Sequence, residues 1–95
     1  MPQEHHLKIW PASFNAIVHG DKRAEFRRNE RNFEVGDVLV LHEFLPETYT
    51  YTHRSQQVVV MDVQRGPAWE IPVGYAMLTI KVLKRGSDGR DEIPC

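Results

Sequence analysis

The chain has 95 residues, a formal net charge of −1 and a hydrophobic fraction of 41%. A chain of this size makes one small domain with a limited core, and its charge excludes a bulk polycation that coats duplex DNA. Any contact with nucleic acid must therefore come from a local cluster of charge. The only cysteine is the last residue, Cys95, which excludes an intramolecular disulfide and a cysteine-based zinc site.

The first elements expected along the chain are a short strand and a short helix. Residues 6–10 alternate polar and apolar side chains, which predicts a strand. From Pro11 the apolar residues follow a helical spacing that includes Phe14 and Ile17, so one stripe of a helix would face the core. Proline suits the first turn of a helix and Gly20 suits its end.

A dense basic segment follows the helix. Residues 22–31 hold 5 of the 12 Lys and Arg residues: Lys22, Arg23, Arg27, Arg28 and Arg31. If this segment is a strand, side chains alternate between its faces, and Arg23, Glu25 and Arg27 share one face. Ala24 and Phe26 lie on the opposite face, which we expect to pack against the core. The charged face is predicted to bind an anionic or hydrogen-bonding ligand, because exposed ion pairs contribute only about 0–1 kcal/mol to stability. The alternative is a solvated strand face.

The rest of the chain is predicted to be mostly strands. Three apolar runs are typical of strands: residues 38–41, 58–63 and 75–83. The first is expected to be buried on both sides, and the last to be central. Residues 48–52 have high β propensity, whereas the polar residues 53–57 are predicted to form a turn or an exposed edge, with a hairpin there. Residues 67–74 contain two prolines and a glycine and are predicted to be a loop.

This order of elements predicts an α+β, mostly β fold: a small mixed barrel, or a curled sheet capped by one short helix after the first strand. We expect residues 1–85 to form a single domain and residues 86–95 to form a flexible C-terminal tail. The N-terminus lacks the features of a signal peptide, and no apolar run approaches the ~18 residues that span a bilayer. We therefore expect a cytoplasmic protein that makes no contact with membranes.

Three stretches of the sequence resemble a known family. They are Leu7-Lys8-Ile9-x-Pro11, then Phe14 followed by Gly20-x-Lys22-x-x-Glu25-x-Arg27, and Asn29-x-Arg31-x-Phe33-x-Val35-Gly36-Asp37. This pattern resembles the ASCH domains of the PUA-like superfamily, and more closely a small ASCH-like group of uncharacterised bacterial and phage proteins. The resemblance covers roughly residues 6–83. It implies a pseudo-barrel of five or six strands, with a cleft between the helix and the barrel that binds RNA or modified nucleosides. Departures from the group's pattern occur at Ala24, Phe44 and His53.

Binding of RNA or of a nucleotide is the function that we expect from these residues. Basic side chains would contact phosphates, Glu25 and Asn29 would read a base edge, and aromatic side chains would stack on bases. The candidate binding residues are Trp10, Lys22, Arg23, Glu25, Arg27, Arg28, Asn29, Arg31, Glu43, Phe44 and Tyr75. For the aromatic residues the alternative is packing in the core. We also expect Glu25 and Arg27 to form a pair across the cleft, which a ligand opens.

The first alternative function is hydrolysis of an acylated nucleoside, with Lys22 and Glu25 as catalytic residues. A lysine with a lowered pKa can act as a base or nucleophile, and a carboxylate can relay the proton. The two residues are three positions apart and fall on opposite faces of a regular strand, unless Lys22 precedes the strand. Small ASCH amidohydrolases that act on acetylated cytidine resemble this chain at Lys22 and Arg27. They carry threonine where Glu25 stands, and a further glutamate in a helical insertion that this chain lacks.

The second alternative is a protein-interaction module without enzymatic activity. An arginine that binds a carboxylate of a protein partner would look the same in the sequence as one that binds phosphate. The five histidines are scattered, with no pair at ligand spacing, so we expect no metal. We also expect no cofactor, and a monomer or weak oligomer.

Overall fold

Strands dominate the fold. A computed structural model of the protein describes residues 2–83, and within that range it contains five strands, one α-helix and a short 3-10 helix. In chain order they are β1 (Glu4–Ile9), α1 (Pro11–Val18), β2 (Ala24–Arg28), β3 (Val38–Leu45), β4 (Thr50–Arg65), η1 (Ala68–Glu70) and β5 (Tyr75–Val82). This is the mostly-β, α+β arrangement with one short helix after the first strand that the sequence predicted. The tail predicted at residues 86–95 lies outside the described residues. In residues 2–83 no helix is long and apolar enough to cross a membrane.

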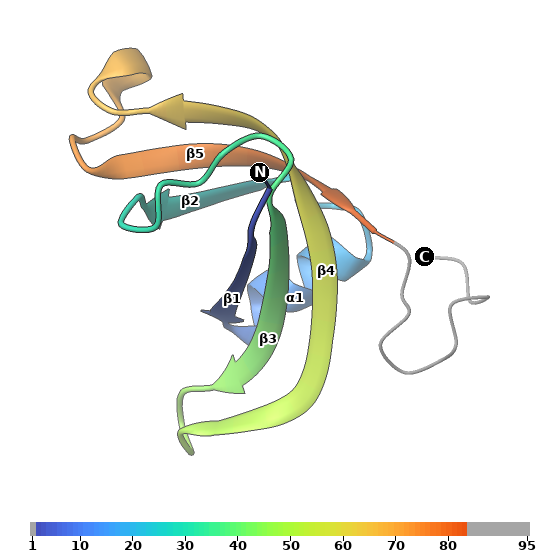
Figure 1. Cartoon of the computed structure of the whole chain (residues 1–95). Helices are drawn as coiled ribbons and strands as arrows, with labels where there is room; N and C mark the ends of the chain where they lie inside the picture. The colour runs from blue at the N-terminus through green and yellow to red at the C-terminus, as the bar shows by residue number, and fades with distance from the viewer. Residues whose placement is uncertain (1, 84–95) are drawn as a thin grey trace.

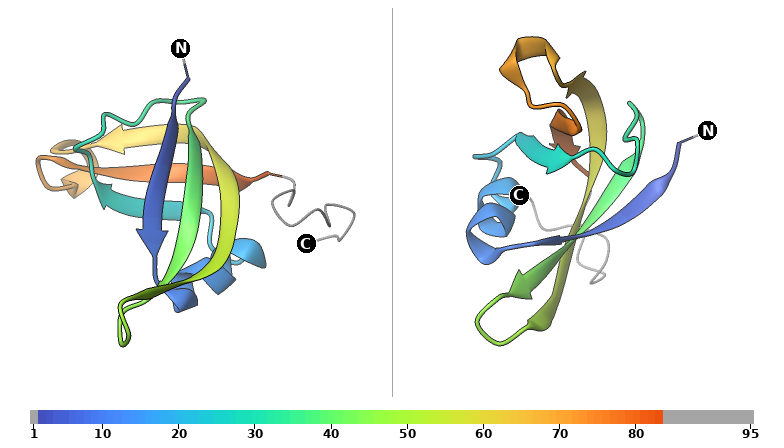
Figure 2. Two further views of the ribbon diagram at one scale, coloured as in Figure 1. Left: turned by 60° about the horizontal axis from the view of Figure 1, so that its bottom comes forward. Right: turned by 90° about the vertical axis from the view of Figure 1, so that its left-hand side faces the viewer.

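The five strands form one curled sheet in the order β1-β3-β4-β5-β2 (Figure 1). β1 pairs with β3 in parallel, and the other neighbours are antiparallel. The left view of Figure 2 shows β1 and β3 running across β5 and β2, with β4 bending from one group to the other. The sheet is therefore a half-barrel with two free edges, which belong to β1 and β2.

The long β4 corrects one prediction. The polar residues 53–57 form no turn, because they lie inside this 16-residue strand. They do lie at an edge, because this half of β4 pairs with β3 alone and the pairing with β5 begins at Val58. Ser55 lies opposite His42 and Gln56 opposite Leu41. Pairing with β3 overrides the weak strand preference of the polar side chains. The hairpin turn lies earlier, between β3 and β4.

The helix forms as the sequence predicted. Pro11 occupies the first turn, and Gly20 follows the helix with a φ of +84°, a conformation that glycine adopts without strain. Phe14 and Ile17 are buried, so one stripe of α1 packs against the sheet. This packing places the start of the helix beside the free edges of β1 and β2.

The faces of β2 are the reverse of the prediction. Phe26 is 46% exposed and stacks on Tyr75 of β5 on the outer face of the sheet, with ring centroids 5.2 Å apart. Glu25 is buried, and Arg27 shares its face. The strand also begins at Ala24, later than Lys22 and Arg23. On the inner face Glu25 pairs with Arg27 and Lys22, whereas on the outer face Phe26 stacks on Tyr75.

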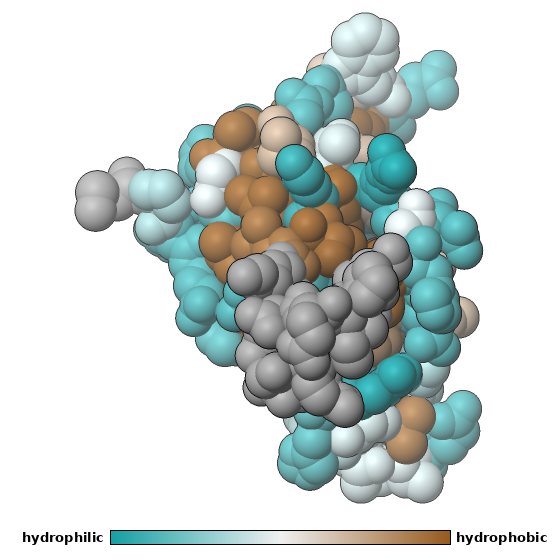
Figure 3. Space-filling model, turned by 90° about the vertical axis from the view of Figure 1, so that its right-hand side faces the viewer, coloured by the Kyte–Doolittle hydropathy of each residue, from teal (hydrophilic) through white to brown (hydrophobic). Residues whose placement is uncertain are grey.

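The core lies between the curled sheet and α1. Its members come from β1, α1, β3, β4 and β5, together with Phe33 from the connection between β2 and β3. Its members are at most 5% exposed, and Figure 3 shows further hydrophobic residues at the surface in the middle of one face. Val38–Leu41, predicted to be a buried strand, supplies Leu39 and Leu41 to this core.

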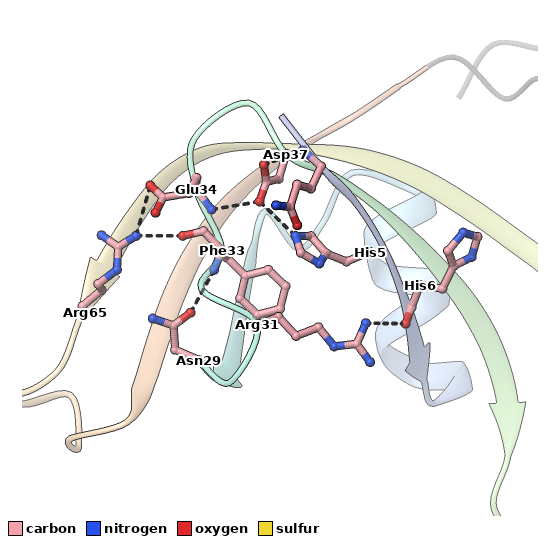
Figure 4. A network of polar contacts seen from close by, with 9 residues as sticks. His5, His6, Asn29, Arg31, Phe33, Glu34, Asp37 and Arg65 are labelled. Carbon is pink, nitrogen blue, oxygen red and sulfur yellow. Dashed lines mark hydrogen bonds and ion pairs between the residues drawn. The ribbon is translucent and has the colours of Figure 1, made fainter. Parts of the chain in front are cut away.

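Asp37 ties the connection between β2 and β3 to the first strand (Figure 4). Its side chain is 2% exposed and accepts hydrogen bonds from the backbone N–H of Gln3 at 2.9 Å and of Glu34 at 3.0 Å, and from Nε2 of His5 at 2.9 Å. Burial alone would raise the pKa of Asp37. The hydrogen bonds from Gln3, His5 and Glu34 outweigh it, and the pKa lies below its ordinary value of 3.8. The carboxylate is therefore a structural anchor.

We expect Asp37→Asn to lower the free energy of unfolding at pH 7 by about 2–4 kcal/mol, because a buried charged acceptor of three hydrogen bonds is lost. The pKa of Asp37 is lower in the folded chain, so its contribution is complete above pH 3.8 and is lost as the pH falls through the folded-state value. Urea unfolding at pH 7 and pH 3 measures both effects. The exposed Asp62→Asn is the control and should change stability by less than about 0.5 kcal/mol. Equal losses in the two variants at pH 7 would show that Asp37 is not an anchor.

Candidate functional site

The two free edges of the half-barrel are joined by arginine side chains. Nη2 of Arg27 donates to the carbonyl oxygen of Lys8 at 2.8 Å, and Nη1 of Arg31 donates to that of His6 at 3.1 Å. His6 and Lys8 are two residues apart in β1, so their carbonyl groups point to the same side of the strand. Figure 4 shows the Arg31 contact. We call this junction between β1 and β2 the seam.

A pocket of about 380 Å³ opens at the seam. The residues that matter for its chemistry are Trp10, Ser13, Glu25, Arg27, Arg28 and Arg31. They come from the start of α1, from β2 and from the turn after β2. We call this the seam pocket.

Glu25 is the buried carboxylate of the seam pocket, with its side chain 8% exposed. Its Oε2 accepts a hydrogen bond from Nε of Arg27 at 2.9 Å. Its Oε1 lies 3.3 Å from Nζ of Lys22, which is within ion-pair distance, but it accepts no hydrogen bond from any described residue. A buried carboxylate oxygen without a hydrogen bond costs free energy. Oε1 is therefore held by its ion pair with Lys22 and has room in its hydrogen bonding for a further donor.

Lys22 reaches Glu25 because it lies before the strand. β2 begins at Ala24, so the alternation of strand faces does not apply to Lys22. Its Nζ also contacts Oγ of Ser13 at 3.2 Å. Nothing in the sequence pattern singled out Ser13, because only the packing of α1 against the seam places its hydroxyl beside Lys22.

The structure brings together six of the predicted site residues. Trp10, Glu25, Arg27, Arg28 and Arg31 line the seam pocket, and Lys22 contacts two of its lining residues. The predicted Glu25–Arg27 pair is present, although it forms along one face of β2, between residues two apart. Trp10 is 61% exposed, so its indole stands at the surface beside the pocket.

The other five predicted residues lie elsewhere. Arg23 is exposed outside the pocket, and its carbonyl oxygen accepts from the backbone of Ile80. Asn29 uses its Oδ1 to accept from the N–H of Phe33 at 3.1 Å, which fixes the turn. Tyr75 stacks on Phe26 on the outer face. These positions result from which way each strand faces, which the charge pattern alone does not determine.

Glu43 and Phe44 belong to β3, away from the seam pocket. Oε1 of Glu43 accepts from Nε of Arg54 at 2.8 Å and from the hydroxyl of Thr52 at 2.8 Å. The hydrogen bond from Arg54 lowers the pKa of Glu43; burial acts in the opposite direction, and the hydrogen bond from Thr52 lowers the pKa further. Phe44 is largely buried and contacts Tyr49 and Tyr51. Both residues therefore serve the β3–β4 hairpin.

In the part of the chain that the structure describes, no group of three or more His, Cys, Asp or Glu side chains is placed to hold a metal ion.

Comparison with known proteins gives two matches. Residues 4–80 match the model of a family described as "Domain of unknown function (DUF3850)". The chain is also similar to a phage protein named "Uncharacterized 12.9 kDa protein in GpA 3'region", from Escherichia phage P2, with 42% identity over 69 residues. The aligned part is 73% of this chain and 62% of the phage protein, so the chain spans less than two thirds of that relative's length. The family match includes every element that contributes to the seam pocket.

We expect Arg27→Ala to lower the free energy of unfolding by about 1–3 kcal/mol, because it removes a partner of the buried Glu25 as well as a hydrogen bond to β1. Arg31→Ala removes one exposed hydrogen bond and should cost less than about 1 kcal/mol. Urea unfolding measures both values, with Arg23→Ala as a control that removes an equal charge outside the seam. A loss for Arg27→Ala no larger than that for Arg31→Ala would contradict the role given to Glu25.

Proposed function

The chain belongs to the DUF3850 family, and we propose that in this member the seam pocket binds one nucleotide of RNA or a modified nucleoside. The observation that carries the proposal is the buried Glu25, whose Oε1 has an ion pair with Lys22 but no hydrogen bond from a described residue, in a pocket whose other charged groups are mainly arginines. A buried carboxylate oxygen selects a ligand that donates a hydrogen bond. Arginines select a ligand that is also an anion.

The base of a nucleotide supplies the missing donor. Nucleobases present N–H groups on their Watson–Crick edges, and unpaired RNA is read through these edges. One such N–H would donate to Oε1 of Glu25. The ammonium of Lys22 lies 3.3 Å from Oε1, and the hydroxyl of Ser13 lies 3.2 Å from that ammonium, so either group could donate to an adjacent acceptor of the same base. A carboxylate beside two donors matches the alternating donors and acceptors of a base edge.

The arginines of the pocket supply contacts for phosphate. Arg31 holds an uncharged carbonyl oxygen of β1, and a phosphate oxygen is a stronger acceptor for a guanidinium than a carbonyl oxygen. Arg28 is exposed and lines the pocket, and its guanidinium lies 5.8 Å from the ring centroid of Tyr75. Arg31 gives up one carbonyl hydrogen bond and Arg28 its contact with Tyr75 to turn to a ligand, whereas Arg27 is held by Glu25.

Trp10 completes the proposed site. Its indole is exposed at the start of α1 and offers a face on which a base stacks, an interaction worth about 1–3 kcal/mol. With Glu25 behind it, held by Arg27 at one oxygen and by Lys22 at the other, a base would be held on its edge and on its face. Stacking and edge contacts together favour a single-stranded ligand.

The proposal extends to the wider family and to the setting of the protein. We place the chain among the ASCH domains of the PUA-like superfamily, on the Gly20-x-Lys22-x-x-Glu25-x-Arg27 pattern and on the curled sheet with its helix after the first strand. The single cysteine at position 95 fits a reducing cytoplasm. We further propose a monomer or weak oligomer without a metal or cofactor.

We expect fluorescent single-stranded RNA to bind more tightly than duplex RNA, with single-stranded DNA as a third probe. Trp10→Ala should weaken the binding of single-stranded RNA about 5- to 100-fold, because a stacking face is lost. Arg28→Gln should reduce the slope of log affinity against log salt by about 0.7, as expected for one lost phosphate contact on a single strand. Fluorescence anisotropy at several salt concentrations measures both effects.

Arg23→Gln is the matched control, because it removes the same charge directly before β2, from a residue that does not line the seam pocket. Its affinity and salt slope should equal those of the wild type. Binding that falls equally in Arg23→Gln and Arg28→Gln would indicate non-specific attraction and contradict a site at the seam. No binding to any of the three probes would reject the proposed function.

A second candidate function is hydrolysis of an acylated nucleoside, favoured by the contacts of Lys22 with Ser13 at 3.2 Å and Glu25 at 3.3 Å. A hydroxyl beside an amine is the arrangement of a nucleophile and its base. As an ammonium paired with Glu25, however, Lys22 donates protons and does not accept them. Hydrolysis therefore stands behind binding.

If the chain is a hydrolase, we expect it to release acetate from acetylated cytidine, and Ser13→Ala and Lys22→Met should each lower the rate at least about 100-fold. Release of cytidine, followed by chromatography, is the measurement. Ser55→Ala, in the middle of β4, is the control. A rate in Ser13→Ala equal to that of the wild type would exclude Ser13 as the nucleophile.

A further inference from the structure

A second pocket, of about 370 Å³, lies on the outer side of β1. Its polar and aromatic side chains are those of His6, Lys8, His42, Tyr51, His53 and Arg54. Five of these six residues are basic. We call it the outer pocket.

The outer pocket and the seam pocket share β1. Both are lined by Leu7 and Lys8. The carbonyl oxygens of His6 and Lys8 accept from Arg31 and Arg27 at the seam, while their side chains line the outer pocket. A ligand that passes over this edge strand, which is about 5 Å wide, therefore contacts both pockets.

A pair of histidines forms the wall of the outer pocket. Nε2 of His6 contacts the carboxylate of Glu4 at 3.0 Å, and a carboxylate accepts hydrogen bonds, so the proton of neutral His6 is on Nε2. Nδ1 of His6 is then an acceptor for Nε2–H of His42, 2.9 Å away. The two rings lie nearly parallel, with centroids 5.1 Å apart. This geometry accommodates one added proton without separating the rings.

The titratable and charged groups around this pair come from three strands. They are Glu4, His6 and Lys8 on β1, His42 and Glu43 on β3, and Tyr51, His53 and Arg54 on β4. Glu43 is occupied by Arg54, and Glu4 by His6. Within residues 2–83 Lys8 forms no ion pair, and its ammonium lies 4.6 Å from the ring centroid of Phe44. Lys8 is therefore a cation without a counter-ion.

His42 is the member of the pair that responds to its surroundings. Burial lowers the pKa of His42, and the neighbouring His6 lowers it further. A bound anion would offset this repulsion, so that His42 takes up a proton as the anion binds.

We propose that the outer pocket is a phosphate subsite for single-stranded nucleic acid, holding the phosphate next to the nucleotide in the seam pocket. The inference rests on the proposed function of the seam pocket. Lys8 supplies the permanent charge, His6 and His42 supply donors, and a phosphate matches the basic lining of the pocket. The strand then crosses β1 between the two sites.

The test compares a short ligand with a long one. We expect Lys8→Gln to reduce the salt slope for a single-stranded RNA hexamer by about 0.7. His42→Gln, which lies in the outer pocket alone, should leave the affinity for cytidine 5′-monophosphate unchanged. Affinity of the wild type for the hexamer should rise at least about threefold between pH 8 and pH 6, because one proton is taken up with the phosphate. His42→Gln should abolish that rise.

The matched controls are Lys81→Gln and His19→Gln, which change the same residue types at exposed positions outside both pockets. Each should keep the salt slope and the pH dependence of the wild type. If the hexamer binds to Lys8→Gln and His42→Gln with the slope and pH dependence of the wild type, the phosphate subsite is rejected while the seam pocket stands.

Inorganic phosphate tests the subsite apart from any nucleic acid. In the wild type it should shift the imidazole nitrogen resonances of His6 and His42, whereas chloride at equal ionic strength should not. Such shifts in a protein that binds none of the RNA probes would reject the proposed function and keep the anion site. Absence of both shifts and RNA binding would reject both.

Discussion

The half-barrel depends on how its two free edges are satisfied. β1 and β2 close the curled sheet without pairing with each other, so the carbonyl groups of His6 and Lys8 need donors other than a neighbouring strand. Arg27 and Arg31 provide them. The same guanidinium groups line a pocket, because side chains that bridge two separated strands leave space between those strands. The closure of the fold and the candidate site are therefore one feature.

Glu25 makes this closure polar. A buried carboxylate is tolerated only with cations and hydrogen bonds around it, and Arg27 and Lys22 provide the charge from either side. The hydrogen bonds remain incomplete at Oε1. An apolar residue at position 25 would give a simpler core, so the arrangement is better explained by a ligand that completes it than by stability. We propose that this ligand is a hydrogen-bond donor with negative charge, as a nucleotide is.

The rest of the molecule holds this region in place. Asp37 ties the connection after β2 to the N-terminal segment through hydrogen bonds from Gln3 and His5. The rings of Phe33 and His5 pack edge to face, with their centroids 4.9 Å apart. Figure 4 shows these contacts beside the Arg31 contact with His6. The first turn of α1 adds Ser13 and Trp10 from the other end. Asp37, Phe33 and the first turn of α1 thus hold β1 in place, and residues of β1 line both the seam pocket and the outer pocket.

The sequence by itself determined the order of elements and the chemical character of the site. Local signals were enough for α1, because Pro11, Phe14 and Gly20 mark its start, its buried stripe and its end, and for the buried β3. The cluster of basic residues near Glu25 was also visible. Only the tertiary structure decided which face of β2 points inward, that residues 53–57 continue β4, and that Ser13 joins Lys22. These features depend on pairing and packing between segments far apart in the chain, and alternation along one strand is the same whichever face is buried.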